Sequence, residues 1–379
     1  MVNNIVKKVL TFKSGNFVLS RKYDEGKLLP SLLEAKILYE TVRDLPILPE
    51  LSAQIEAELI RRSIFGTAAL EGNPLTEERV GQIISEPAKE QKMERAEKEI
   101  RNLKVAYDSF IRKWDVSDSV FKLEKDHITK IHSIVTHDIE YENNVPGQYR
   151  NHLVKVGDAE HGGVYAPPKM LADIEKLMRE FIQWINNEEI LNLDPVIRAA
   201  LAHYHFGLIH PFGDGNGRTA RLIEALLMRL AGMKYVPIML SNFYYKNMDE
   251  YFLAFSNARK SEEHDVTPFV GFVLKGVVGS LNEIKERIIF FIRKFALRDY
   301  YAFLRTGKRI TQRQHDLLSI ALDGLTPFTL GDLFIVSPFN VLYRNISERT
   351  VRRDLKKLSD AQLLYVAEGK YHLNVRVLE

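Results

Sequence analysis

The segment His210–Arg221 combines residue types that could bind a phosphate group and activate a nucleophile against it. It reads His-Pro-Phe-Gly-Asp-Gly-Asn-Gly-Arg-Thr-Ala-Arg. His210 could accept a proton from a hydroxyl group, because the pKa of a histidine is normally about 6.5. Asp214 offers the hard carboxylate oxygens that Mg²⁺ shares with phosphates. Arg218 and Arg221 carry planar guanidinium groups that suit phosphate oxygens.

Glycines in the same segment predict a loop that can approach an anion closely. Gly215 and Gly217 permit backbone conformations that are closed to other residues. Successive N–H groups in such a turn bind anions. Asn216, between the two glycines, tolerates the left-handed conformation and can donate to an oxygen. We expect Phe212 to anchor this loop in the core.

The flanking segments predict that the loop joins two helices. Apolar residues recur at helical spacing in Asp194–Ile209, and they do so again in Arg218–Leu230. The loop therefore leads into a helix N-terminus, where unpaired N–H groups and the positive end of the helix dipole favour an anion. We expect a phosphate to bind at this point.

Residues 210–221 resemble the signature of the Fic-domain family, HPFxDGNGRxxR, at all nine specified positions. Pro146–Arg150 is similar to the start of that family's β-hairpin, the flap, which would extend over Val154–Pro168. Met170–Asn186 fits the next core helix, and the resemblance covers about residues 50–275. It implies a mainly α fold, in which a helical core carries the flap.

The resemblance also implies an activity, that of a protein adenylyltransferase. Such an enzyme transfers AMP from ATP to a Ser, Thr or Tyr hydroxyl. His210 would be the catalytic base, and Asp214 would hold Mg²⁺. Val164 and Tyr165 of the flap would dock the target by strand addition. The residues implied to bind the nucleotide are Asp214, Gly215, Asn216, Gly217, Arg218, Thr219, Ala220, Arg221 and Tyr251.

A second motif, Thr67–Asn73, is similar to the inhibitory (Ser/Thr)-x-x-x-Glu-(Gly/Asn) motif of the family. Gly72 is predicted to end the helix that precedes it. The resemblance implies that Thr67, Glu71 and Gly72 form an inhibitory element in which Glu71 pairs with Arg221. That pairing would keep Arg221 from the γ-phosphate of ATP. An ordinary helix stop is the competing interpretation of Glu71.

Two tyrosines and the activity itself allow more than one interpretation. Tyr165 and Tyr251 could be core aromatic residues rather than contacts with the target and the base. Relatives with this fold also remove AMP or transfer other phosphate-containing groups. In a different class, the chain could be a transcriptional regulator that uses its C-terminal part and senses a nucleotide through its core.

Residues 308–379 have a different pattern from the rest of the chain. Helices are predicted at Thr311–Ala321, Thr329–Val336 and Ser347–Leu358, followed by a hairpin over 363–374. This order resembles a small α+β winged helix-turn-helix domain, whose third helix would enter the DNA major groove. The 11 basic and 8 acidic residues give a net charge of only +3. Protein docking or dimerisation is therefore favoured over DNA binding through residues 347–358.

Composition narrows the class of protein. The chain has 379 residues, a formal net charge of +3 and no cysteine. The near balance of charge argues against a polybasic protein that coats nucleic acid or membrane. The lack of cysteine excludes disulfides and thiolate metal sites, and it suits a reducing cytoplasm. No signal-peptide core or membrane-spanning run is present, so we expect a cytoplasmic protein without membrane contact.

The length predicts two or three domains. We expect an N-terminal extension with the inhibitory helix over residues 1–100, a Fic catalytic domain over 101–300 and the winged-helix domain over 308–379. The expected partners are ATP with Mg²⁺ and a target protein with a hydroxyl side chain. Self-modification and a homodimer are further partner hypotheses that the resemblance allows.

Overall fold

The computed structural model describes residues 5–87, 93–112, 120–324 and 326–378. The chain divides into two compact units. Unit 1 comprises Met1–Asp44 and Leu48–Lys285, and unit 2 comprises Leu45–Ile47 and Glu286–Glu379. The boundary falls within α12 (Thr267–Thr306). Unit 1 thus contains both the expected N-terminal extension and most of the expected catalytic segment. None of the described helices is both long enough and apolar enough to cross a bilayer.

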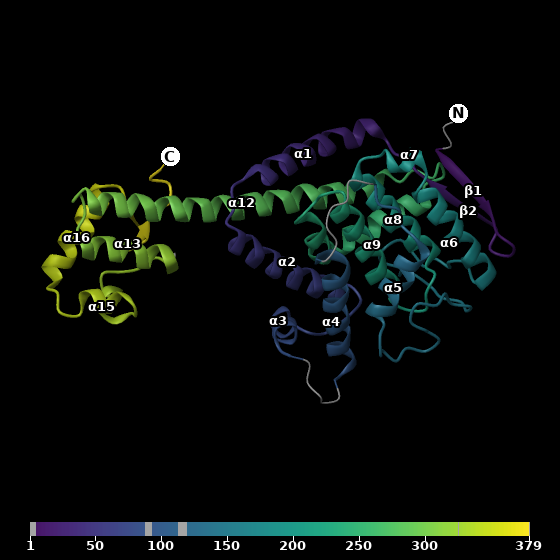
Figure 1. Cartoon of the computed structure of the whole chain (residues 1–379), viewed down its shortest axis with the longest axis horizontal. Coiled ribbons are helices and arrows are strands. Elements are labelled where there is room, and N and C mark those ends of the chain that lie inside the picture. Colours follow the sequence, from purple (N-terminus) through teal and green to yellow (C-terminus); the bar gives the residue numbers. More distant parts are fainter. Residues whose placement is uncertain (1–4, 88–92, 113–119, 325, 379) are drawn as a thin grey trace. The chain divides into compact units, whose positions relative to one another are not determined.

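Unit 1 is mainly helical (Figure 1), as the sequence predicts. Before α12 its elements are β1 (Val6–Leu10), β2 (Asn16–Ser20), α1 (Glu25–Asp44), α2 (Pro49–Ala69), α3 (Glu77–Ser85), α4 (Arg95–Ala106), the π-helix η1 (Tyr107–Arg112), α5 (Lys125–Val135), α6 (Leu171–Ile185), α7 (Glu188–Leu191), α8 (Pro195–Ile209), α9 (Asn216–Leu230), the 3-10 helix η2 (Val236–Ile238), α10 (Leu240–Lys246) and α11 (Met248–Lys260). Strands β1 and β2 pair antiparallel, with Val6 opposite Ser20.

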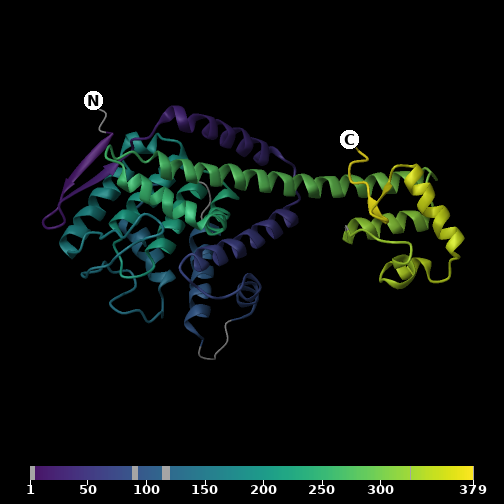
Figure 2. The same cartoon turned by 180° about the vertical axis from the view of Figure 1, so that it is seen from behind.

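The N-terminal hairpin is fastened to α6, beside which it lies in both views (Figures 1 and 2). The buried carboxylate of Asp173 accepts hydrogen bonds from the backbone N–H groups of Phe12, Lys13 and Ser14, at 2.6, 3.0 and 2.9 Å. A buried carboxylate requires such partners. Asp173 therefore fixes the hairpin turn against the helical core.

The core of unit 1 is built around α8 and α9. Helix α8 is apolar on nearly every side and is buried along almost its whole length, as expected for a central helix. α6 packs against α8, while α2 and α5 pack against α9. The two central helices are joined by the loop that the sequence singles out. Phe212 of this loop is fully buried, which confirms that it anchors the loop.

Helix α2 ends in a Schellman motif. Gly72 has a φ of +82°, the N–H of Asn73 donates to the Ala68 carbonyl at 3.1 Å, and the N–H of Gly72 donates to the Ala69 carbonyl at 2.9 Å. These two bonds satisfy the last carbonyls of the helix. Glu71 is thereby held in the turn that follows α2, immediately before Gly72.

Unit 2 contains α13 (Gln312–Gly324), α14 (Asp332–Ile335), α15 (Phe339–Tyr343), α16 (Glu348–Asp360), β3 (Leu364–Ala367) and β4 (Lys370–Leu373). The helix predicted over Thr329–Val336 is present but shorter, as α14, and a second short helix that was not predicted, α15, follows it. Pro338 between them cannot continue a helix that ends at Ile335. The predicted hairpin is present, and an antiparallel bridge joins Phe328 to Tyr371.

Helix α2 approaches α10 so closely that Gly66 has no space for a side chain. A Cβ at this position would lie 2.8 Å from both Asn242 Cα and Ser241 O, which are backbone atoms that cannot move aside alone. We therefore expect Gly66→Ala to lower the free energy of unfolding of unit 1 by about 1–3 kcal/mol. Thermal or denaturant midpoints of the full chain would measure this.

Gly81→Ala is the matched control for that experiment. It also lies inside a helix, but a Cβ there would meet only the flexible Arg61 side chain, at 3.2 Å. Because alanine favours helices, Gly81→Ala should leave the midpoint unchanged or raise it. Equal effects of the two substitutions would show that the α2–α10 contact is not tight.

Candidate active site

Two residues in left-handed conformations shape the loop between α8 and α9. His210 caps the C-terminus of α8 with φ 48° and ψ 60°, and Gly215 caps the N-terminus of α9 with φ 76°. Asn216, which tolerates the left-handed conformation, does not adopt it here, because it is already the first residue of α9.

The strained turn at His210 is held by Arg150. Its Nε donates to the His210 carbonyl at 2.8 Å, and its backbone N–H donates to the Pro211 carbonyl at 2.9 Å. A non-glycine residue in the left-handed region is uncommon and needs such support. Arg150, which ends the segment before the predicted flap, therefore has a definite role in orienting the histidine.

The side chain of Asn216 closes the loop on itself. Its Oδ1 accepts the N–H of Phe212 at 2.9 Å, and its Nδ2 donates to the Phe212 carbonyl at 2.8 Å. The amide therefore holds the anion-binding turn in shape. Anion contacts at this position are left to the backbone N–H groups of the first turn of α9.

A residue that the sequence did not single out, His132 of α5, lies directly under the loop. Its ring stacks on Phe212 with centroids 3.6 Å apart and an angle of 4° between the planes. Its Nδ1 accepts the Gly147 N–H at 2.9 Å, so its Nε2 carries the proton and donates to the Asp214 carbonyl at 2.9 Å. Burial lowers the pKa of His132 to about 4, which preserves this neutral form. A single histidine on a helix gives no sequence signal for such a role.

Arg218 is almost fully buried and only partly paired. Its Nη2 donates to Asp214 Oδ2 at 2.8 Å, and its Nη1 lies 3.8 Å from Glu99 Oε1. In the described part of the chain, Nε and Nη1 have no hydrogen-bond partner. Buried donors of this kind are normally satisfied. Arg218 therefore has unused capacity to bind an anion.

Arg221 is held by the segment that resembles an inhibitory motif. Its Nε donates to Thr67 Oγ1 at 2.7 Å, and its Nη2 donates to Glu71 Oε1 at 2.5 Å. Burial alone would lower the pKa of Arg221, but the neighbouring Glu71 carboxylate raises it. The pairing implied by the resemblance is thus present. It depends on Gly217, because a Cβ there would collide with Glu71 Oε1.

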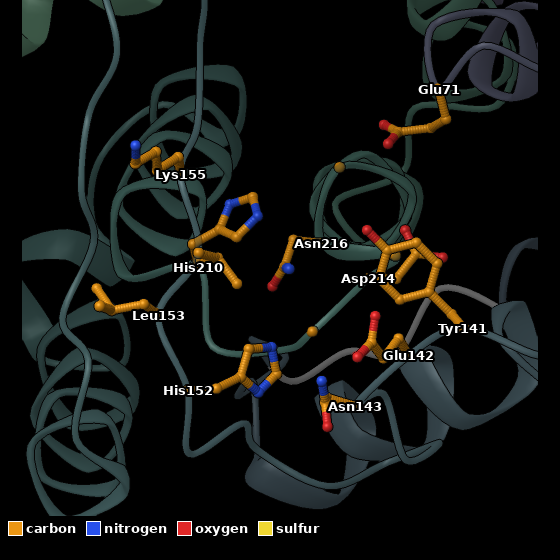
Figure 3. Close-up of a pocket in the computed structure, with 14 residues that line it drawn as sticks. Glu71, Tyr141, Glu142, Asn143, His152, Leu153, Lys155, His210, Asp214 and Asn216 are labelled. Carbon is orange, nitrogen blue, oxygen red and sulfur yellow. The ribbon is translucent and has the colours of Figure 1, made fainter.

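A pocket of about 560 Å³ opens over the loop (Figure 3). Its lining includes Glu71, His210 and the backbone of the first turn of α9. Tyr141 and Lys155, which the sequence did not single out, also line it, and Lys155 comes from the predicted flap segment. The full lining is Glu71, Tyr141, Glu142, Asn143, His152, Leu153, Val154, Lys155, His210, Gly213, Asp214, Gly215, Asn216 and Gly217.

His210 has the protonation state that a base needs. Burial, assisted by the positive charge of Arg150, lowers the pKa of His210 to about 4, although Glu71 and Asp214 act in the opposite direction. The imidazole is therefore neutral near pH 7 and can accept a proton. Figure 3 shows its ring directed into the pocket, beside the start of α9.

Three residues expected to bind the nucleotide are buried, as Arg218 and Arg221 also are. Thr219 and Ala220 are fully buried on α9. Tyr251 is 6% exposed, its hydroxyl lies 3.0 Å from His203 Nε2, and its ring stacks on Tyr244. Neither these three residues nor the two arginines line the pocket. The structure therefore favours the interpretation of Tyr251 as a core aromatic residue.

The flap segment forms a minimal hairpin rather than a pair of extended strands. Val156 and Tyr165 make one antiparallel bridge, with N–H···O distances of 2.9 and 2.7 Å. Tyr165 also donates from its hydroxyl to the Leu208 carbonyl at 3.1 Å, so it anchors the segment on α8. Val164 is 57% exposed and remains accessible to another molecule.

Comparison with known proteins finds the family that the motif resembles. Residues 122–228 match the Fic/DOC family. "Protein adenylyltransferase Fic" of Drosophila erecta is 39% identical over 132 residues, which are 34% of this chain and 23% of that protein. "Protein adenylyltransferase fic-1" of Caenorhabditis elegans is 38% identical over 105 residues, 28% of this chain and 19% of that protein. The chain thus spans less than a quarter of the length of these relatives.

Solved structures extend the likeness of fold beyond the matched residues. A Fic family protein from Desulfovibrio desulfuricans G20 superposes with a TM-score of 0.56 at 21% identity, over 92% of this chain and 95% of that one. A fragment of Fic-1 from C. elegans has a TM-score of 0.55 at 26% identity, over 69% of this chain and 72% of the fragment. Residues 122–228, which match the Fic/DOC family, hold the histidine, the loop and both arginines.

Proposed function

We propose that this chain is a protein adenylyltransferase, which transfers AMP from ATP to a hydroxyl group of a target protein or of the chain itself. The observation that carries the proposal is a neutral His210 beside the N-terminal turn of α9, where two buried arginines are gathered. A base next to an anion site is what hydroxyl attack on a phosphate requires. The likeness to two protein adenylyltransferases, from D. erecta and C. elegans, supports the same activity.

The reaction assigns one task to each group. His210 takes the proton of the target hydroxyl as its oxygen bonds to the α-phosphorus of ATP. The bond from that phosphorus to the β-phosphate oxygen breaks, and pyrophosphate leaves. The N–H groups at Gly215–Gly217 stabilise the negative charge that develops on the phosphates. Arg218, with its two unpartnered nitrogens, binds the departing pyrophosphate.

Asp214 fits the binding of Mg²⁺ together with ATP. Both neighbouring cations, Arg218 and Arg95, face its Oδ2 oxygen, at 2.8 and 3.9 Å, so Oδ1 is directed elsewhere. No cluster of three His, Asp or Glu side chains that could hold a metal occurs among the described residues. Mg²⁺ commonly takes one or two carboxylates and completes its shell with substrate phosphates and water. When bound, the ion would neutralise charge on the phosphates.

We also propose that Glu71 inhibits this activity. Glu71 and Thr67 occupy Arg221, which is then not available to the γ-phosphate. The carboxylate of Glu71 also places a negative charge at the start of α9, where the triphosphate would lie. Productive ATP binding therefore requires that this ion pair break, and the resting chain has low activity.

Removal of the proposed base should abolish transfer. In a Glu71→Gly background, we expect His210→Ala to lower the rate of AMP transfer by at least about 100-fold. The affinity for ATP should stay within about twofold, because the phosphates are held by α9 and the arginines. Intact mass after incubation with Mg²⁺ and ATP measures transfer, and calorimetry measures binding. His137→Ala, an exposed histidine, is the control in the same background. Transfer by Glu71→Gly/His210→Ala at the rate of its Glu71→Gly parent would exclude His210 as the base.

Removal of the proposed inhibitor should raise activity. We expect Glu71→Gly to increase the initial rate of AMP incorporation by at least about tenfold, since it frees Arg221 and removes a charge from the phosphate site. Glu71→Gln keeps the shape but not the charge, and it should give an intermediate rate. The rates are compared at saturating ATP by mass spectrometry. If neither variant exceeds the wild type, Glu71 is only part of a helix end.

The pH dependence of the Glu71→Gly variant reports on the base. His210 must be neutral to accept a proton, and its pKa is lowered to about 4. Glu71 raises this pKa, so its loss should not increase the pH at which activity falls on acidification. We expect kcat/KM at saturating Mg²⁺ to be nearly constant from about pH 8 to about pH 5.5. A fall to half near pH 6.5 would contradict the lowered pKa.

A further inference from the structure

The solvent side of α16 in unit 2 is unusual because every exposed position along it is charged. Its opposite side packs Val351, Leu355 and Leu358 into the core of unit 2. The exposed basic residues, called the basic face below, are Arg349, Arg352, Arg353, Lys356 and Lys357. The two exposed acidic residues, Glu348 and Asp360, lie at the two ends of the helix.

Part of the basic face is not neutralised by the chain. Arg352 pairs with Glu348 at 2.6 Å and Lys356 with Asp360 at 3.0 Å, but exposed pairs of this kind are weak. No ion pair joins Arg349, Arg353 or Lys357 to any acidic residue in the described segments. These three residues follow one another at intervals of four, so they form one row along the helix. The three side chains of this row can therefore pair with an anionic partner.

The positive charge of the chain is concentrated in unit 2. That unit has 16 basic and 10 acidic residues, a net charge of +6, whereas unit 1 has 37 basic and 40 acidic residues, a net charge of −3. The near balance of the whole chain therefore conceals two units of opposite charge. The residues from Lys308 onward carry only +3 because the remaining basic residues of unit 2 lie in the second half of α12.

The chemistry of the surface distinguishes between two kinds of partner. Protein interfaces are enriched in aromatic side chains, methionine and arginine, and they are depleted in lysine. Protein–DNA interfaces are polar and strongly positive. The exposed positions of α16 include no apolar side chain. The basic face therefore matches the phosphates of a nucleic acid.

The rest of unit 2 holds α16 firmly and leaves this face open. The buried carboxylate of Asp354 accepts hydrogen bonds from Arg313 Nε at 2.7 Å and Gln314 Nε2 at 3.2 Å, which fastens α16 to α13. The β3–β4 hairpin follows α16, and Lys370 is exposed at its turn. A helix of 13 residues is about 20 Å long and can lie in a DNA major groove.

We propose that unit 2 binds duplex DNA, with the basic face of α16 in the major groove and Lys370 on the phosphate backbone. Arg349, Arg353 and Lys357 are the principal contacts. This binding is independent of AMP transfer, because none of these residues belongs to the active site of unit 1.

The test is binding of the full chain to a fluorescent 30-base-pair duplex, followed by anisotropy at several salt concentrations. We expect affinity to fall steeply as salt rises, because counterions are released from each contacted phosphate. The triple variant Arg349→Ala/Arg353→Ala/Lys357→Ala should bind at least tenfold more weakly. Its slope of log K against log salt should be shallower by about 2.7, since each contact contributes about 0.9.

A matched control removes three exposed lysines from unit 1, with Lys36→Ala/Lys130→Ala/Lys169→Ala. It should bind DNA like the wild type. All six positions are exposed, so neither variant should unfold, and thermal midpoints check this. If the wild type fails to bind duplex at 50 mM salt, or if the triple variant binds as tightly as the wild type, the proposal is overturned. The basic face would then be assigned to an acidic protein partner.

Discussion

Two arginines buried at the start of one helix impose the central constraint on this fold. Arg218 and Arg221 are each less than 5% exposed, and a buried guanidinium without a partner is costly. Asp214 provides a carboxylate for Arg218 from within the loop, whereas Glu224, the carboxylate of α9, accepts a hydrogen bond from Tyr244. The partners of Arg221 come from the end of α2 and the turn after it, as Thr67 and Glu71. One interaction therefore joins the end of α2 to the start of α9, where the proposed phosphate site lies.

The loop itself is held from several separate elements. His132 of α5 supports the Asp214 carbonyl, Arg150 supports His210 and Pro211, and Asn216 closes the turn around Phe212. Each contact fixes a backbone group whose position determines where an anion would sit. Electrostatic stabilisation is effective when its donors are already in place before reaction. Many of the polar side chains around the loop thus keep its backbone rigid and need not contact a ligand themselves.

Local patterns were enough to predict the parts of the site that lie close together in the sequence. The helical spacing around the loop predicted α8 and α9, and the turn chemistry predicted that Gly72 would end α2. Residues whose roles depend on distant contacts could not be found in this way. His132 is hydrogen-bonded to the carbonyl of Asp214, which lies 82 positions later in the sequence. Tyr251 is held in the core by contacts with His203 and Tyr244. The net charge of the whole chain likewise did not reveal that unit 1 is negative and unit 2 positive.

The end of α2 has a consequence for how the phosphate site meets solution anions. Gly72 ends the turn after α2 directly behind Glu71, so the backbone at Glu71 is fixed and its carboxylate lies against Gly217. The resting chain thereby carries its own counter-ion at the site. A group tethered in this manner acts at an effective concentration of about millimolar or above. Under the proposed function, free phosphate and other small anions would compete with that internal ligand, and molecules that hold several phosphates together would be favoured.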